Sequence, residues 1–394
     1  MNVALVEFSP SGGLFQFAFQ LGAALADRGH EVALLTGPDP ELRSDRSGFR
    51  VLPVLPTWHP APAGPEPALL RKARRAVRAL AYVRAWRRCL TELRALSPDV
   101  VQWASWRFVV DGLFVRVLAR RRPARVLVDL CHESRRPSWP SEGVPESDRV
   151  LRWSIGGAFR RMDAVLVLGE RAREDFRTVW PGVRRVEVVP HGDESVFLVS
   201  AVRPVADTSP CALFFGTLAG YKGLDVLLAA WALVRTRLPA AELVLAGAPG
   251  DVDVPELQRR AVAVGGVRVW PGYVPMLDVP PLFAAARVVV APYTRANQSG
   301  VVHLAQTFAR PVVATTVGDL PDVVVDGETG LLVPPADVPA LADALERLLR
   351  DVEEAELLGA TGRERLTRAA SWAEVARRTE AIYADLLRER VGCP

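Results

Sequence analysis

The residues CALFFGTLAGYKGLDVLLAAW (211–231) show most directly how this chain folds. They begin with an apolar run that is typical of a buried strand, and a glycine turn follows at Gly216. After Lys222 and Gly223 the apolar side chains recur with helical spacing. A strand, a turn and a helix in this order are typical of βαβ units, in which helices connect parallel strands. We therefore expect residues 211–231 to open a parallel, doubly wound sheet.

The same alternation of short β-branched runs and amphipathic stretches continues on both sides of this unit. We expect strands at residues 3–6, 32–35, 100–102, 126–129, 165–168, 186–189, 212–215, 243–246, 267–269, 288–291 and 312–315. A chain of 394 residues is too long for one ordinary core. The sequence thus predicts an α/β protein with two Rossmann-like domains, at 1–195 and 205–370, and a C-terminal helix at 371–394 that packs back on the first domain.

The composition, 49% hydrophobic and 24% charged, is that of a folded protein. The four cysteines show no CxxC spacing, which argues against a disulfide framework or a zinc site. The N-terminus does not resemble a secretory leader, and no apolar stretch reaches the roughly 18–20 residues that a membrane-spanning helix needs. We therefore expect a cytoplasmic protein whose membrane contact, if it has one, is peripheral.

The segment Arg71–Arg88 contains eight basic residues and no acidic one. Two interpretations remain open: a solvated charged helix face, or a platform that binds an anionic membrane surface through arginines around an apolar stripe. The stripe would comprise Leu69, Leu70, Ala73, Val77, Leu80 and Ala81. Nucleic acid is a disfavoured partner, because no aromatic stacking platform accompanies the arginines. The proline-rich stretch 57–67 before this segment is expected to be a surface loop.

Three places could bind phosphate. Gly12 and Gly13 follow the first strand, where backbone amides can approach an anion at a helix start, although a plain tight turn explains them as well. Lys222 is one of only two lysines and is well placed to neutralise a diphosphate leaving group. A solvated surface lysine is the alternative. The residues 298–300, Gln-Ser-Gly, begin a helix whose free amides suit an anion, and a simple helix cap is the alternative there.

Several motifs together resemble those of the retaining GT-B glycosyltransferases of family GT4. They are GG at 12–13, RGHEV at 28–32, VVPHGD at 188–193, FFG…YKGLDVLL from 214, LVLAG at 243–247 and SGVVHLAQTFARPVVATTVGDLPDVVVDGETGLLVPP from 299. The resemblance covers nearly the whole chain and is most specific in the C-terminal half. It implies transfer of a sugar from a UDP- or GDP-sugar to an acceptor hydroxyl with retention of configuration, without a metal or cofactor. Polysaccharide, glycolipid or natural-product glycoside biosynthesis would be the setting.

The resemblance also assigns roles to residues. Lys222 matches the phosphate-binding lysine, Gly12 and Gly13 match the N-terminal glycine loop, and His132 matches an active-site histidine that faces the donor sugar. The turn that meets the nucleotide base corresponds to Gly272, Tyr273 and Val274. Further donor contacts are implied at Gly216, Thr217, Gly247, Asn297, Gln298, Ser299, Gly300 and Val301.

The chain departs from the family pattern at several positions. Thr217 stands where an arginine is usual, and Ala296 and Leu304 stand where the family has two glutamates. The loop ANQSG looks like a variant found in a subset of these enzymes, in which Asn297 and Gln298 would replace the lost contacts. Pro190-His191-Gly192 replaces the usual PNG turn.

The sequence also leaves alternatives to this function. With both carboxylates missing, the chain could be an inactive relative that binds a sugar nucleotide or a partner. Asp251-Val252-Asp253 formally matches a metal-binding DxD pair, and a dehydrogenase is disfavoured because the GxGxxG fingerprint is absent. His132 could be a structural histidine, whereas a Cys131–His132 nucleophile is disfavoured because adjacent residues at a strand end point apart.

Overall fold

The computed structural model describes residues 1–58, 68–104, 106, 108–132, 148–198, 201–295 and 299–391. The chain forms two compact units, Met1–His191 with Trp372–Pro394, and Gly192–Ser371. Residues 59–67 of the expected proline-rich loop lie outside the described part. None of the helices in the described ranges is long and apolar enough to cross a membrane.

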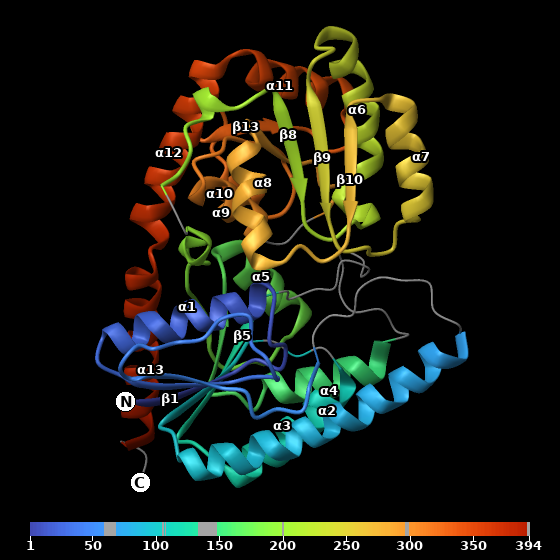
Figure 1. Cartoon of the computed structure of the whole chain (residues 1–394). Coiled ribbons are helices and arrows are strands. Elements are labelled where there is room, and N and C mark those ends of the chain that lie inside the picture. The colour runs from blue at the N-terminus through green and yellow to red at the C-terminus, as the bar shows by residue number, and fades with distance from the viewer. Residues whose placement is uncertain are drawn as a thin grey trace. The chain divides into compact units, whose positions relative to one another are not determined.

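The first unit is built on a seven-stranded parallel sheet of order β3-β2-β1-β4-β5-β6-β7 (Figure 1). Its strands are β1 (Asn2–Val6), β2 (Glu31–Leu35), β3 (Phe49–Leu52), β4 (Val100–Trp103), β5 (Val126–Cys131), β6 (Ala164–Val167) and β7 (Val186–Val188). Its helices are α1 (Gly13–Asp27), α2 (Ala68–Leu96), α3 (Val109–Arg121), α4 (Arg149–Phe159), α5 (Glu170–Val179) and α13 (Trp372–Val391). The strand order reverses between β1 and β4, and ligands of doubly wound sheets bind at the carboxyl ends of strands at such a point.

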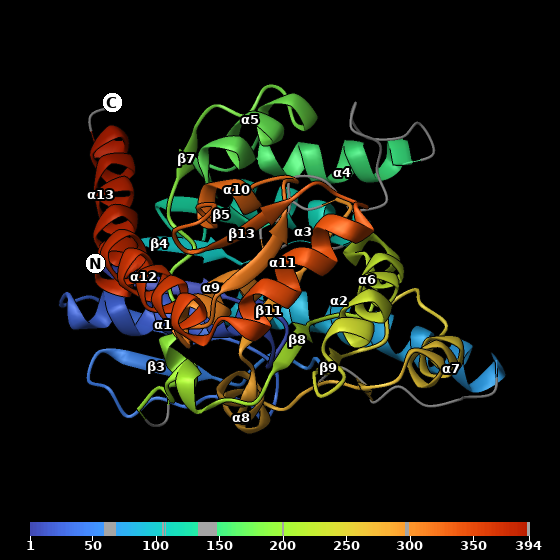
Figure 2. The same ribbon diagram turned by 90° about the horizontal axis from the view of Figure 1, so that it is seen from above.

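The C-terminal helix α13 is part of this first unit. Figures 1 and 2 show α13, in red, beside α1, in blue. The hydroxyl of Tyr383 in α13 donates a buried hydrogen bond to Oε1 of Gln102, 2.6 Å away in β4. Arg185 forms ion pairs with Asp385 and Glu389 of the same helix. The last helix therefore closes the core of the first sheet.

The second unit has a six-stranded parallel sheet of order β10-β9-β8-β11-β12-β13. Its strands are β8 (Cys211–Phe215), β9 (Glu242–Gly247), β10 (Val267–Pro271), β11 (Val288–Ala291), β12 (Val312–Thr315) and β13 (Gly330–Val333). Its α-helices are α6 (Leu224–Arg237), α7 (Val254–Val264), α8 (Val279–Ala285), α9 (Gly300–Thr307), α10 (Leu320–Val323), α11 (Val338–Arg350) and α12 (Val352–Ala370). Short 3₁₀ turns are η2 (Ser195–Phe197), η3 (Val205–Asp207), η4 (Gly220–Lys222) and η5 (Met276–Asp278). The order reverses between β8 and β11, so the switch point lies beside Gly216.

The α/β fold class predicted from the sequence is confirmed, and every expected strand is present with ends that shift by at most two residues. The expected domains end at 195 and begin at 205, whereas the second unit of the structure already begins at Gly192, because Phe197 and Val205 are buried in that unit's core. Two of the described strands, β3 and β13, were not predicted from the sequence. The edge strand β3 buries only Phe49, and β13 begins with Gly330, where any side chain would overlap the carbonyl of Val312.

Candidate functional site

Three predicted donor-site residues meet at the carboxyl end of β8. Gly216 follows this strand with φ 110°, and its amide donates to the carbonyl of Ala246. A Cβ at position 216 would lie 2.9 Å from Nζ of Lys222 and 3.5 Å from Cγ2 of Val301. The ammonium of Lys222 thus lies against the Gly216 backbone, which the first turn of α9 also approaches. Only glycine suits position 216, both for its positive φ and for this close approach.

Lys222 is positioned by the short turn η4 and by the loop that follows β11. Gly223 ends η4 in a left-handed conformation with φ 71°, and a Cβ there would overlap the carbonyl oxygen of Pro292. The amide and hydroxyl of Thr294 both donate to the carbonyl of Tyr221, at 2.9 and 3.0 Å. These contacts hold the Lys222 turn and the β11 loop together as one structure.

Tyr293 contacts both the start of α9 and Lys222. The Tyr293 hydroxyl lies 3.2 Å from Oγ of Ser299, and Nζ of Lys222 lies 5.1 Å from the centre of the Tyr293 ring. Ser299 is the N-cap residue of α9, but its side chain makes no capping hydrogen bond to the first turn. The simple-cap explanation of Ser299 therefore loses its support.

His303 is a buried residue of α9 that the sequence reasoning missed. Its Nδ1 lies 3.3 Å from the carbonyl oxygen of Ser299, and Oγ1 of Thr307 donates to the His303 carbonyl. Burial lowers the pKa of His303 from 6.5 to about 4, so the ring is neutral near pH 7 and Nδ1–H donates to Ser299. The spacing of four residues between Ser299 and His303 was the available signal, since such pairs are neighbours on a helix.

The ends of β9 and β10 complete this edge of the sheet. Gly247 has φ 155°, and a Cβ there would overlap the Gly216 carbonyl. The amide of Gly272 donates to the carbonyl of Gly247 at 2.9 Å, and the turn continues with exposed Tyr273 and buried Val274. Thr217 is exposed beside these glycines. The predicted residues of the second unit are thus brought together at the carboxyl ends of β8, β9 and β10.

The loop before α9 contains three of the residues singled out in the sequence. Ala296, Asn297 and Gln298 lie outside the described residues. Leu304, at the second glutamate position of the family, is buried in the core of the second unit. An apolar side chain there is accounted for by packing.

The two carboxylates of the DxD match have local roles. Oδ1 of Asp251 accepts a hydrogen bond from the amide of Gly220 at 2.8 Å. Oδ1 of Asp253 accepts from the amide of Glu256 and caps α7. Within the described residues, no group of three or more His, Cys, Asp or Glu side chains could hold a metal ion. Helix capping and a turn contact therefore explain this motif.

In the first unit, the predicted glycine loop contacts an internal carboxylate. Gly12 has φ 87° and precedes α1, which begins at Gly13. Oε2 of Glu41 accepts from the Gly12 amide at 3.1 Å and from Nε2 of Gln16 at 3.0 Å. The start of a helix favours a negative charge, and here Glu41 supplies it. Sequence reasoning missed Glu41 because it lies in a different loop.

His132 lies just after β5 in a cluster of aromatic rings. The Phe17 ring contacts the rings of His132, His191 and Trp372, with centroids 5.1, 5.8 and 5.0 Å away. Cys131 belongs to the core on the opposite face of the sheet from Phe17. The two neighbours therefore point apart, which removes the Cys–His nucleophile. Gly12, Gly13 and His132 follow the carboxyl ends of two strands of the same sheet, β1 and β5.

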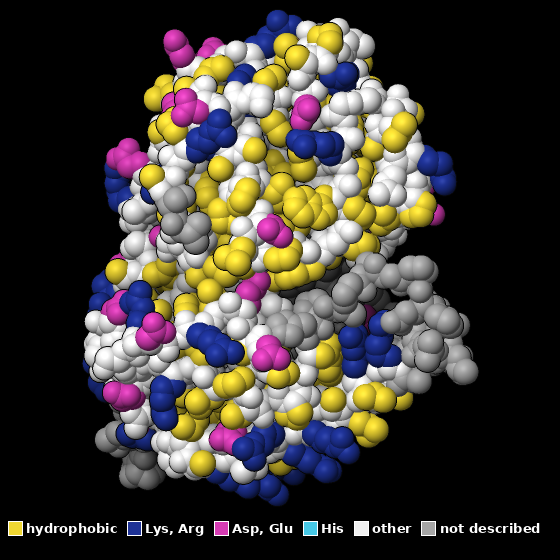
Figure 3. Space-filling view, viewed as in Figure 1, with side chains coloured by type: hydrophobic (Ala, Val, Ile, Leu, Met, Phe, Trp, Pro, Cys, Tyr) yellow, Lys and Arg dark blue, Asp and Glu magenta, His cyan; other side chains and the backbone are white. Residues whose placement is uncertain are grey.

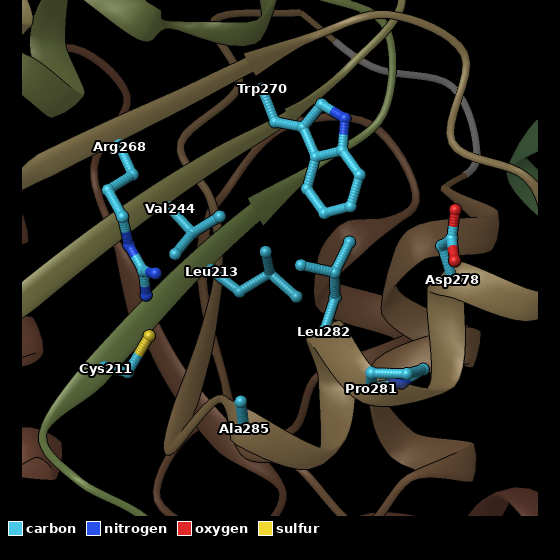
Figure 4. Close-up of a pocket in the computed structure, with 9 residues that line it drawn as sticks. All are labelled: Cys211, Leu213, Val244, Arg268, Trp270, Asp278, Pro281, Leu282 and Ala285. Carbon is cyan, nitrogen blue, oxygen red and sulfur yellow. The ribbon is translucent and has the colours of Figure 1, made fainter.

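A separate pocket of about 230 Å³ lies on the face of the second sheet (Figure 4). Leu213, Val244 and Leu282 form apolar walls, with Arg268 and Asp278 at opposite ends in the view. None of the predicted donor-site residues that the structure describes lines it. We therefore identify the candidate site with the strand ends around Gly216 and not with this pocket.

Family comparisons match both halves of the chain. Residues 12–192 match the glycosyl transferase 4-like domain, and residues 209–351 match glycosyl transferases group 1. An α-maltose-1-phosphate synthase from Mycolicibacterium smegmatis is 32% identical over 62% of this chain and 69% of its own length.

Solved structures with the same fold include sucrose-phosphate synthase from Thermosynechococcus elongatus. It has a TM-score of 0.73 at 22% identity and covers 98% of this chain and 99% of its own. HepE of Anabaena, crystallised with UDP-glucose, has a TM-score of 0.67 at 17% identity. The match covers 98% of this chain and 100% of the HepE chain. Both halves of the chain match family models of glycosyltransferases, and a relative is 32% identical over 69% of its length. The two Rossmann-like sheets are those of the same fold. The chain therefore belongs to the GT-B glycosyltransferases of family GT4.

Proposed function

We propose that this protein transfers a sugar from a UDP- or GDP-sugar to an acceptor hydroxyl and keeps the anomeric configuration of the sugar. The second unit would bind the donor, and the first unit would supply the acceptor side. Polysaccharide, glycolipid or natural-product glycoside biosynthesis is the proposed setting. A nucleotide-sugar donor agrees with the HepE complex with UDP-glucose, which shares the fold.

One observation carries this proposal. Nζ of Lys222 and Cγ2 of Val301, in the first turn of α9, both lie against Gly216. A cation and a helix start at the carboxyl edge of a parallel sheet together suit a diphosphate, because both favour negative charge. Charge that builds up on the leaving nucleoside diphosphate would be stabilised there by groups that are already in place.

The proposed reaction uses no metal. Lys222 and the α9 amides would take the part that a divalent cation has in other transferases, while Asp251 and Asp253 are engaged with the amides of Gly220 and Glu256. The proposed retention of configuration rests on membership of this family. His132 is proposed to face the donor sugar.

The acceptor is proposed to be a sugar, a lipid-linked sugar or a small molecule, and α2 is proposed to bring the protein to an anionic membrane. Val77 and Leu80 of the expected apolar stripe are 65% and 62% exposed. The packed face of α2 is instead formed by Tyr82, Trp86, Cys89 and Leu93 in its second half. The exposed apolar residues of the first half suit a lipid interface.

Lys222→Ala tests the diphosphate role. We expect transfer to fall by at least about 10²-fold, because a charge-stabilising group of the transition state is removed. Lys222→Arg keeps the charge but not the compact ammonium, and should restore only part of the activity. The matched control is Arg365→Ala, which removes an exposed cation of α12 in the same unit. Donor affinity is measured by calorimetry against a panel of UDP- and GDP-sugars, and turnover is measured in parallel.

Unchanged turnover in Lys222→Ala would remove the diphosphate role. Donor binding that is strong in the wild type but accompanied by no transfer to any acceptor would favour the inactive-relative interpretation. The buried Leu304 at a family glutamate position is the observation behind that alternative.

A further inference from the structure

Arginines converge between α3 and α4 in the first unit. Nη2 of Arg116 donates to the carbonyl of Trp153 at 3.1 Å, and Nη1 of Arg161 donates to the carbonyl of Gly157 at 2.6 Å. A Cβ at position 157 would lie 2.5 Å from Nη2 of Arg116, so the two guanidinium groups approach the same turn of α4. Arg120 extends the group along α3 and Arg160 along the end of α4. We refer to Arg116, Arg120, Arg160 and Arg161 as the arginine cluster.

The charges of the arginine cluster are close enough to repel one another. Burial, followed by repulsion from Arg116, Arg120 and Arg160, lowers the pKa of Arg161. Nε of Arg116 is buried and makes no hydrogen bond within the described structure.

The acidic residues within α3 and α4 do not offset this charge. Asp111 is the one acidic residue within α3 and α4, and it is buried. Its carboxylate accepts from Nε1 of Trp86 and from the amide of Phe108. A surface that collects positive charge in this way favours an anion.

Apolar side chains stand exposed beside the arginine cluster. Val150 and Trp153 of α4 are 63% and 52% exposed, and Leu113 and Val117 of α3 are exposed as well. The guanidinium of Arg116 lies over the Trp153 ring, 3.7 Å from its centre. Figure 3 shows Lys and Arg side chains gathered over the α2 and α3 region with hydrophobic ones among them. Tryptophan and arginine together are typical of the boundary between lipid headgroups and acyl chains.

We propose that the arginine cluster is a phosphate-binding site for anionic lipid headgroups, with Leu113, Val117, Val150 and Trp153 inserted at the headgroup boundary. The complementary charge calls for an anion, and the apolar residues around it call for a lipid instead of a free phosphate ion. The site extends the proposed membrane association of α2 to α3 and α4, but it does not depend on sugar transfer.

Co-sedimentation of the full chain with vesicles tests this site. Vesicles of equal parts phosphatidylglycerol and phosphatidylcholine are compared with vesicles of phosphatidylcholine alone. The pair Arg116→Gln and Arg120→Gln should bind the anionic vesicles about thirtyfold more weakly than the wild type, the change that corresponds to about 1 kcal/mol for each arginine near such a surface. The pair Arg363→Gln and Arg365→Gln on α12 removes the same charge from the other unit and should bind like the wild type. Circular dichroism of each variant verifies its fold.

Two further variants separate this site from α2 and from general charge attraction. The pair Arg84→Gln and Arg87→Gln removes the same charge from α2, and binding that falls only in this pair would overturn the arginine cluster. Trp153→Phe should lose a blue shift of tryptophan emission that anionic vesicles induce in the wild type.

Inorganic phosphate provides the last arm. Binding of inorganic phosphate to the wild type, without binding of anionic vesicles, would overturn the lipid assignment. Equal vesicle binding by the arginine-cluster pair and the α12 control pair would overturn the site itself.

Discussion

Acidification is expected to destabilise the second unit through His303. This ring is buried in α9, and burial penalises the charged imidazolium, so the ring is neutral in the folded state near pH 7. Its Nδ1–H donates to the carbonyl of Ser299. The pKa of His303 is lowered to about 4 by burial, whereas a histidine in the unfolded chain takes up its proton near 6.5. Between these two values the unfolded chain binds one more proton than the folded one, and the free energy of unfolding falls as the pH falls.

The difference between 6.5 and about 4 corresponds to a loss of about 3 kcal/mol on acidification across that range. The loss begins below pH 6.5 and is complete near pH 4. His303→Gln removes the titrating group but leaves an amide that can donate to Ser299. The variant should therefore lack this component of the pH dependence while it keeps the contribution of all other groups.

Hydrogen-exchange mass spectrometry measures this, because peptides from α9 and β12 report the opening of the second unit separately from the first. The free energy of opening is compared between wild type and His303→Gln from pH 7 to pH 4, after correction for intrinsic exchange rates. The two curves should diverge by about 3 kcal/mol in favour of the variant as the pH falls. Parallel curves would show that the imidazole titrates normally, and the argument from burial would fail.

Three other predictions concern the loops around the site. Gly223→Ala should cost about 1–3 kcal/mol of stability, because a side chain at φ 71° is strained and would overlap the Pro292 carbonyl. Thermal unfolding should show the lower stability, and titration with donor should show a weaker affinity. An unchanged donor affinity would show that the η4 turn has no part in donor binding. EDTA is expected to leave transfer unaffected, and activity that EDTA removes and Mn²⁺ restores would support a metal role for Asp253. Asp253→Ala should lower stability by about 1 kcal/mol through loss of the α7 cap. Gln298→Ala should weaken UDP or GDP binding by about 1–3 kcal/mol in calorimetry, as for a lost hydrogen bond to a charged group, and Gln298→Glu should weaken it further. Indifference of the affinity to both changes would leave this loop without a part in donor binding.

The sequence predicted the parts of this protein that depend on local patterns. Parallel strands covered on both faces are continuous apolar runs, and runs such as 288–291 therefore matched the strands closely. The meeting of Gly216 and Lys222 followed from the strand-turn-helix order, because the carboxyl ends of parallel strands share one edge of the sheet.

Contacts between distant loops were beyond such reasoning. Glu41 reaches the amide of Gly12 across 29 positions, and nothing in the local pattern around either residue indicates it. The apolar spacing of α2 was visible, but a helix of 29 residues buries only the part that meets the sheet, so the stripe at Val77 and Leu80 is exposed. The burial of His303 also depends on the surrounding core and not on α9 alone.

The membership of α13 in the first unit has a consequence for synthesis on the ribosome. Residues 192–371 form an uninterrupted unit and can fold as soon as they have emerged. The first sheet cannot complete its core until α13 has been synthesised. Four residues of α13 fill part of that core, namely Val375, Ala376, Tyr383 and Leu386, and Tyr383 donates to Gln102. Part of one apolar face of the N-terminal half therefore stays uncovered until α13 is made, and the half that is made first is the last to complete its core.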